Sequence, residues 1–261
     1  MLIAMAICIC IAMALALLGA LYANTSAIPR RIPRRIMQTW KTRALSARMR
    51  EITQTWELAN RGYVYRLYDD DECRRLIEVK FGPRVVAAYD AIEAGAFKAD
   101  MWRYCALYVH GGVYVDLDTL CIGPIDSIIE PAAELVVPVD LDSRNLFNAF
   151  LAVVPRHPVM LACVKRIVAN VETGVDQSGF HFSGPGLLGR CVADYLHLAP
   201  GARFVPGTYG GIQFLDFSPR TEIVSSVDGR GLFLNKNGDS AIMHVYMSES
   251  EHAGIVRYRV S

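Results

Sequence analysis

Hydrophobic and polar positions along the chain follow two alternating periods, one typical of helices and one typical of strands. Helical segments carry apolar residues three or four positions apart, and strand segments are short apolar or alternating runs. The pattern predicts helices at residues 44–60, 69–81, 84–94, 97–110, 157–171 and 186–198. It predicts strands at residues 35–40, 63–68, 113–115, 133–139 and 150–154, with short strands and glycine-rich turns from residue 203 onwards. Strands that alternate with helices predict an α/β fold with a mainly parallel central sheet flanked by helices.

The first 23 residues are mostly apolar and carry no charged side chain. A helix of this length can cross the hydrocarbon core of a bilayer. A cleaved signal peptide is the alternative, although its usual basic start and shorter apolar core are missing. We therefore expect a transmembrane helix over residues 1–23, a short linker over residues 24–31 and one folded domain over residues 32–261.

Composition narrows the class of protein. With 261 residues, of which 52% are hydrophobic and 20% charged, the chain can form one sizeable α/β domain and does not have a disordered composition. A net charge of +1 gives no sign of a nucleic-acid partner. The cysteines include no C-x-x-C pair, so neither a zinc site nor a disulfide framework is indicated. Cys105 and Cys163 lie in apolar surroundings and are expected in the core.

Two aspartates stand one residue apart where an apolar strand is predicted to end. Asp116 and Asp118 follow the strand at residues 113–115, and alternate residues of a strand share one side. Ligands of open α/β sheets bind at this edge. Two carboxylates so close repel each other unless a cation lies between them, and Mg²⁺ or Mn²⁺ held by carboxylates and substrate phosphates is the usual solution. The alternative for an isolated D-x-D is a solvated turn.

The helix at residues 97–110 leads directly into this strand. Asp100 and Arg103 are three positions apart and share one face of that helix. In a ligand pocket, the carboxylate accepts hydrogen bonds from sugar hydroxyls and the guanidinium binds a hydroxyl or phosphate. On that interpretation, their replacement lowers activity with little effect on stability. The alternative is a surface ion pair, which contributes little.

The residues around these two pairs resemble a known family. The run FKADMWRYCALYVHGGVYVDLD, residues 97–118, is similar to the signature of the DXD-sugar-binding glycosyltransferases, family 32. This family includes the relatives of the yeast initiating α-1,6-mannosyltransferase and of the inositol phosphorylceramide mannosyltransferases. The run IPRRIMQTWK, residues 32–41, resembles the family's opening strand, with Met37 where a histidine is usual. Weaker similarity further along extends the resemblance to about residue 198.

The resemblance implies a GT-A fold, a nucleotide-sugar donor, a divalent metal (Mn²⁺ or Mg²⁺) and retention of the anomeric configuration. At matching positions, Asp116 and Asp118 bind the metal and the diphosphate, and Asp100 and Arg103 contact the donor sugar. The other matching positions are Gln38 and Trp40 near the nucleotide base, Asn148 near the sugar or acceptor, and His244 as a late metal ligand. Ser183 and Gly184 lie in a later Gly-rich turn, whose backbone can approach a substrate closely.

Three of these outer positions also have structural interpretations. Asn148 can cap a turn, and the Gly-rich segment at residues 183–186 can start a helix. His244 lacks the Ser-Trp pair that follows the late histidine in the family, since residues 247–250 read MSES. A histidine after an apolar strand can instead be a structural residue.

The predicted activity is metal-dependent transfer of a hexose, mannose or galactose, with retention. The expected donor is GDP-mannose or a UDP-hexose, and the expected acceptor is a glycan or a glycolipid. A phosphatase of the haloacid-dehalogenase type is one alternative, because residues 113–120 also fit its h-h-h-D-x-D-x-T motif with Asp116 as nucleophile. That fold expects the motif on its first strand and a late pair of aspartates, and Gly238-Asp239 lacks the second one. A non-catalytic sugar-binding relative is the other alternative.

The same resemblance favours a single-pass protein with its catalytic domain in a Golgi- or ER-like lumen. The four arginines at positions 30, 31, 34 and 35 follow the apolar segment, and the positive-inside rule would place the domain in the cytosol. Arg34 and Arg35 also fall in the predicted opening strand. Both orientations therefore stay open, with the lumen preferred.

Overall fold

One ten-stranded sheet organises the part of the chain that the computed structural model describes. That part comprises residues 30–175, 177, 179–219, 232–236 and 239–244. Its helices are α2 (Ala47–Ala59), α3 (Asp70–Phe81), α4 (Pro83–Ala91), α5 (Gly95–His110), α6 (Pro158–Glu172) and α7 (Pro185–Tyr195). Its strands are β1 (Arg35–Thr39), β2 (Val64–Tyr68), β3 (Gly112–Val115), β4 (Thr119–Cys121), β5 (Leu135–Pro138), β6 (Phe150–Val153), β7 (Gly207–Tyr209), β8 (Ile212–Pro219), β9 (Leu232–Lys236) and β10 (Asp239–His244).

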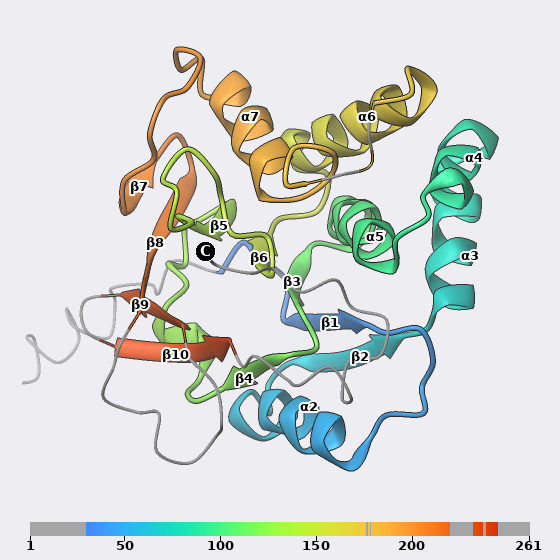
Figure 1. The fold of residues 1–261 in the computed structure, drawn as a ribbon. Helices are drawn as coiled ribbons and strands as arrows, with labels where there is room; N and C mark the ends of the chain where they lie inside the picture. Colours follow the sequence, from blue (N-terminus) through green and yellow to red (C-terminus); the bar gives the residue numbers. More distant parts are fainter. Residues whose placement is uncertain (1–29, 176, 178, 220–231, 237–238, 245–261) are drawn as a thin grey trace, which may run out of the picture. The chain divides into compact units, whose positions relative to one another are not determined.

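The sheet is mixed. Its strand order is β2-β1-β3-β6-β5-β8-β9-β10-β4, and β7 pairs with β8 (Figure 1). β1 runs parallel to β2 and β3, and β5 runs parallel to β8, whereas the other described pairs are antiparallel. The prediction of a mainly parallel sheet is therefore wrong. A parallel return needs a crossover of about a dozen or more residues, usually helical, and residues 139–149 between β5 and β6 contain no helix.

The helices predicted from apolar spacing are confirmed to within a few residues at each end. Their starts have local causes. Ser46 caps α2, because its hydroxyl accepts a hydrogen bond from the backbone N–H of Met49 (3.2 Å). Asp69 and Glu72 form a capping box that starts α3. Prolines stand at the first position of α4, α6 and α7, where a missing N–H costs nothing.

Two glycines make the close connection between α5 and β3. Gly111 ends the helix with φ 59°, and Gly112 has φ 100°. A Cβ atom on Gly111 would lie 2.6 Å from the ring of Pro155, and one on Gly112 would lie 2.8 Å from the carbonyl oxygen of Arg35. Only glycine fits both the backbone and the space, so this pair fixes how α5 leads into the central strand.

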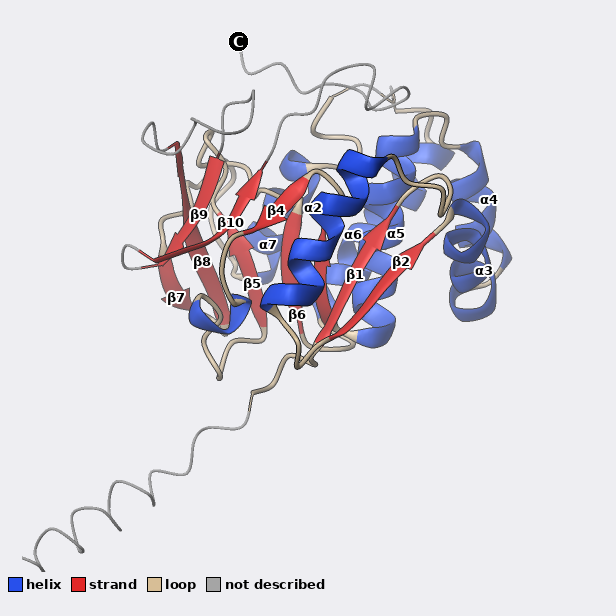
Figure 2. Ribbon diagram, turned by 90° about the horizontal axis from the view of Figure 1, so that it is seen from below, coloured by secondary structure: helices blue, strands red, loops and turns tan. Residues whose placement is uncertain are grey.

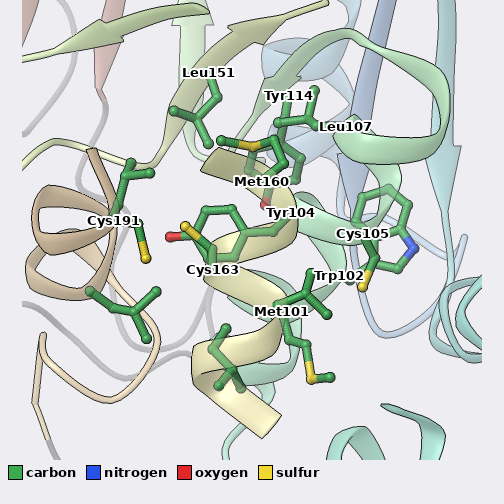
Figure 3. Packing of buried hydrophobic residues seen from close by; sticks show 14 of the residues in the cluster. Met101, Trp102, Tyr104, Cys105, Leu107, Tyr114, Leu151, Met160, Cys163 and Cys191 are labelled. Carbon is green, nitrogen blue, oxygen red and sulfur yellow. The ribbon is translucent and has the colours of Figure 1, made fainter. Parts of the chain in front are cut away.

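Helices cover both faces of the sheet (Figures 1 and 2). α2 packs beside β4, while α5 packs with α6, and α6 packs with both α4 and α7. Figure 3 shows the larger core between α5, α6 and α7, where Trp102, Tyr104 and Cys163 are fully buried. Cys105 is also 0% exposed, so both cysteines expected in the core lie there. The cysteines of the described part are free thiols.

The predicted membrane anchor at residues 1–23 lies outside the described residues, as does most of the linker. Among the residues that the structure does describe, no helix has the length and apolar character needed to cross a bilayer.

Candidate active site

The two aspartates lie in a tight turn between β3 and β4, residues 116–119, which we call the DXD turn. β3 ends at Val115, Leu117 is buried, and β4 begins at Thr119. The carbonyl oxygen of Asp116 accepts hydrogen bonds from the backbone N–H of Thr119 (3.1 Å) and from its hydroxyl. The strand does not continue through the motif, so a turn rather than strand alternation sets the placement of Asp116 and Asp118.

The carboxylate of Asp116 is held from inside the protein. Its Oδ1 lies 3.0 Å from Nη2 of Arg103 and accepts a hydrogen bond from the hydroxyl of Tyr114 (2.7 Å). The backbone N–H of Asp116 donates to the carbonyl oxygen of Ala149 at the start of β6 (2.9 Å). The side chain nevertheless keeps 28% of its surface exposed. Asp116 therefore joins the buried network to the surface of the turn.

Arg103 is the centre of that network. Its side chain is 4% exposed, its Nη1 donates to the carbonyl oxygen of Asn148 (2.6 Å), and its Nη2 lies 3.1 Å from Oδ1 of Asp100. The guanidinium also stacks over the ring of Tyr114, 4.4 Å from the centroid. A guanidinium buried among two carboxylates is not a surface ion pair, so that alternative is wrong.

Asp100 is buried beneath the glycine-rich turn before α7. Its Oδ1 accepts a hydrogen bond from the side-chain amide of Asn148 (2.8 Å), and its Oδ2 accepts one from the hydroxyl of Ser183 (2.7 Å). A Cβ atom on Gly184 would lie 3.5 Å from the same Oδ2. Burial raises the pKa of Asp100, and the nearby Arg103 guanidinium limits that rise. The structure thus brings six predicted residues together: Asp100, Arg103, Asp116, Asn148, Ser183 and Gly184.

Two tyrosines complete this network and were not among the sequence candidates. Tyr104 donates from its hydroxyl to the carbonyl oxygen of Ser183 (3.1 Å) and receives a hydrogen bond from Asn148 (3.2 Å). Tyr114 contacts Asp116. Their positions in the sequence were the available signal, because Tyr104 follows Arg103 directly and Tyr114 stands two residues before Asp116.

Gln38 on β1 and Trp40 just after it, the two candidates for contact with the nucleotide base, differ in burial. Gln38 is 0% exposed and hydrogen-bonds within the protein, whereas Trp40 is only partly buried. Trp40 packs against a small apolar cluster that includes Leu117 of the DXD turn. Trp40 therefore adjoins the turn from the side of β1, while Gln38 lies beneath it.

The late histidine ends β10, whose backbone pairs with β4. In that ladder, His244 is opposite Thr119, the residue after Asp118. The structure thus brings the backbone of a residue more than a hundred positions away to the edge of the DXD turn. The side chain of His244 lies outside what is described.

The donor set at the turn consists of oxygen atoms. Within the described part of the chain, no group of three or more His, Cys, Asp and Glu side chains gathers as a complete metal site. Hard cations such as Mg²⁺ and Mn²⁺ are commonly bound by one or two carboxylates together with substrate phosphates. The carboxylates of Asp116 and Asp118 fit that kind of shared site.

Comparison with solved structures identifies the class of fold. The structure resembles a protein titled "PaToxG Glycosyltransferase" with a TM-score of 0.55, 18% sequence identity and coverage of 67% of this chain and 74% of that one. The chain therefore has an α/β fold of the glycosyltransferase type, with a mixed sheet flanked by helices.

Comparison with families and curated proteins is more specific. Residues 46–133 match the family described as "Glycosyltransferase sugar-binding region containing DXD motif". The initiation-specific alpha-1,6-mannosyltransferase of Candida albicans is 37% identical over 103 residues, which cover 37% of this chain and 27% of that protein. The putative glycosyltransferase HOC1 of Saccharomyces cerevisiae is 28% identical over 197 residues, 64% of this chain and 50% of that protein. Inositol phosphoceramide mannosyltransferase 3 of Schizosaccharomyces pombe is 29% identical over 154 residues, which cover 56% of this chain and 39% of that protein.

These matches confirm the family resemblance found in the sequence. The matched residues 46–133 contain α5, β3 and the DXD turn. The chain spans about half the length, or less, of these curated relatives.

Proposed function

We propose that this protein is a metal-dependent, retaining glycosyltransferase that moves a hexose from a nucleotide sugar to a glycan or glycolipid. One observation carries the proposal. Arg103 joins the first DXD aspartate to Asp100, at distances of 3.0 and 3.1 Å, at the carboxyl end of β3. Ligands of open α/β sheets bind at such ends. The names of the mannosyltransferase relatives favour mannose as the sugar.

The buried network has a direct chemical use. Asp116 and Asp118 would hold a divalent cation, which when bound supplies Lewis-acid stabilisation of the departing diphosphate. Arg103 fixes the orientation of Asp116 because it contacts the carboxylate and is itself locked by Asn148 and Asp100. The chain thus presents a preorganised anionic turn, which costs no reorganisation when the substrate binds.

Direct contact between Asp100 and the donor sugar depends on Ser183. The carboxylate is 2% exposed, and the Ser183 hydroxyl covers its Oδ2. A donor-sugar hydroxyl therefore reaches Asp100 only if Ser183 moves. With Ser183 in place, Asp100 acts through its contact with Arg103.

Retention is assigned from the family resemblance and fits a simple balance of bonds. The acceptor hydroxyl attacks the anomeric carbon from the side of the leaving group, the bond to the diphosphate breaks, and the departing phosphate oxygen takes the hydroxyl proton. No protein side chain forms a covalent intermediate in this route. Asp116, with Oδ1 engaged by Arg103 and Tyr114, is poorly placed to be a nucleophile.

The phosphatase alternative is disfavoured by the order of the strands. Its motif belongs on the first strand of the domain, whereas β1 and β2 precede β3 here. The paired and partly buried carboxylate of Asp116 also argues against an aspartyl-phosphate intermediate.

Turnover of sugar nucleotides tests the proposal. We expect the full-length protein, purified in detergent, to hydrolyse or transfer from one member of a panel of GDP- and UDP-sugars in the presence of Mn²⁺. Removal of the metal with EDTA should abolish this turnover. Release of phosphate from phosphomonoesters without sugar-nucleotide turnover would support the phosphatase, and binding of a sugar nucleotide without turnover would support the non-catalytic relative.

We further propose a single-pass membrane protein with a lumenal catalytic domain. The apolar segment at residues 1–23 is long enough to span a bilayer. The protein should resist extraction by carbonate at high pH, and a C-terminal tag should be protected from protease in intact microsomes. Digestion of the tag without detergent would place the domain in the cytosol, and release by carbonate would exclude the anchor.

A further inference from the structure

Gln38 lies beneath the DXD turn with both ends of its side chain engaged. Its Nε2 donates a hydrogen bond to the carbonyl oxygen of Asp116 (3.0 Å), and its Oε1 accepts one from the hydroxyl of Tyr65 on β2 (2.7 Å). The side chain is 0% exposed. A nucleotide therefore cannot reach the Gln38 amide unless it breaks contacts that the protein already makes.

The carbonyl of Asp116 determines which way the Gln38 amide points, because a carbonyl oxygen can only accept. A reversed amide would place its oxygen against that carbonyl oxygen. With the Nε2 end held at the turn, the Oε1 end faces β2 and accepts from the Tyr65 hydroxyl. Tyr65 therefore fixes the end of the Gln38 side chain that is remote from the turn.

The other end of the turn is fixed from α2. Nε1 of Trp56, a fully buried side chain, donates to the carbonyl oxygen of Thr119 (2.7 Å). Gln38 thus holds the backbone at Asp116 and Trp56 holds it at Thr119, with Asp118 between the two fixed carbonyl groups.

We propose that Gln38 and Tyr65 form a positioning pair that sets the geometry of the DXD turn, and that Gln38 does not contact substrate. The role given to the turn rests on the proposed function, since the pair acts on residues that would hold a divalent cation. Groups that orient metal ligands typically change metal affinity by about 10- to 100-fold when they are mutated.

A second buried glutamine provides a matched control. Gln213 on β8 is 2% exposed, its Nε2 donates to the carbonyl oxygen of Ile128 (2.8 Å), and its Oε1 accepts from the backbone N–H of Glu130 (2.9 Å). The side chain has the same chemistry and burial as Gln38, but it holds a segment outside the DXD turn. Loss of Gln213 reports the structural cost alone.

The test compares Gln38→Met, Tyr65→Phe and Gln213→Met in the full-length protein. Amide hydrogen exchange at residues 116–119 is measured without metal, and affinity for Mn²⁺, alone and with UDP or GDP present, is measured from the EPR signal of the free ion. We expect Gln38→Met to speed exchange at the turn and to weaken Mn²⁺ binding by about 10-fold or more. Tyr65→Phe should have a smaller effect of the same kind, and none when added to Gln38→Met. Gln213→Met should lower the melting temperature without either change at the turn.

Unchanged exchange at the turn in Gln38→Met, or an equal change there in Gln213→Met, would overturn the positioning role. So would a change in nucleotide affinity alone, because that result identifies a substrate contact. If Gln38→Met fails to fold, unchanged exchange in Tyr65→Phe overturns the pair by itself. A wild-type protein that binds Mn²⁺ neither alone nor with UDP or GDP, combined with faster exchange in Gln38→Met, would reject the proposed function and leave the positioning role intact.

Discussion

Replacement of Asp118 by asparagine is expected to reduce sugar transfer about a thousandfold while the fold stays intact. An amide is a neutral and weaker ligand, so the cation that stabilises the departing diphosphate would be lost or misplaced. Several kcal/mol of transition-state stabilisation correspond to about that factor in rate. Asp118 lies at the tip of the turn and is partly exposed, so its replacement should leave the melting temperature close to that of the wild type.

Asp194→Asn is the matched control for this change. Asp194 is an exposed carboxylate on α7 that pairs with Arg166 (2.9 Å), in a part of the structure that the mechanism does not use. Its replacement should leave both turnover and melting temperature unchanged. Near wild-type turnover by Asp118→Asn with saturating Mn²⁺ would rule out the metal role of the turn.

Replacement of Arg103 by alanine is expected to lower both activity and stability. The change leaves the buried Asp100 carboxylate without its guanidinium partner, and removing one partner of a buried ion pair costs about 3–5 kcal/mol. For a chain of this size, that loss lowers the melting temperature on the order of 10 °C. Activity should fall at least about a hundredfold, because Asp116 also loses the contact that orients it.

This expectation differs from the one drawn from the sequence, which allowed loss of activity with little change in stability. Burial of Arg103 and Asp100, at 4% and 2% exposure, is the reason. Arg84→Ala is the control, because Arg84 makes two contacts of 2.6 Å with Glu172 at an exposed site and its loss should barely shift the melting temperature. An Arg103→Ala protein as stable and active as the wild type would contradict the role of Arg103 as the centre of this network.

Local sequence pattern was sufficient for most helices and for the strands around the site. It could not reveal β4, which has only three residues and whose backbone pairs with β10 more than a hundred positions later. Nor could it fix the direction of β6, which depends on how the loop at residues 139–149 returns to the sheet. Both features come from contacts between distant segments, and periodicity within a segment carries no information about them.

In the candidate site, too, the residue types could be predicted from the sequence, whereas their contacts and burial could not. The residue types of Asp100, Arg103 and Asn148 indicated polar chemistry near the DXD turn, and the structure brings them into one network. Their burial was not visible in the sequence, since α5 is covered on nearly every side by the sheet and by neighbouring helices. Gln38 shows the limit most clearly, because its position in the motif suggested a ligand contact while its surroundings show two internal hydrogen bonds.

The central claim is that the DXD turn binds the diphosphate of a nucleotide sugar through a divalent cation. Calorimetric titration of UDP and of GDP into the full-length protein, with Mn²⁺ and then with EDTA, tests it most directly. We predict that one of the two nucleotides binds only when Mn²⁺ is present and that Asp118→Asn abolishes this binding. Equal binding in EDTA, or unchanged Mn²⁺-dependent binding by Asp118→Asn, would contradict the account.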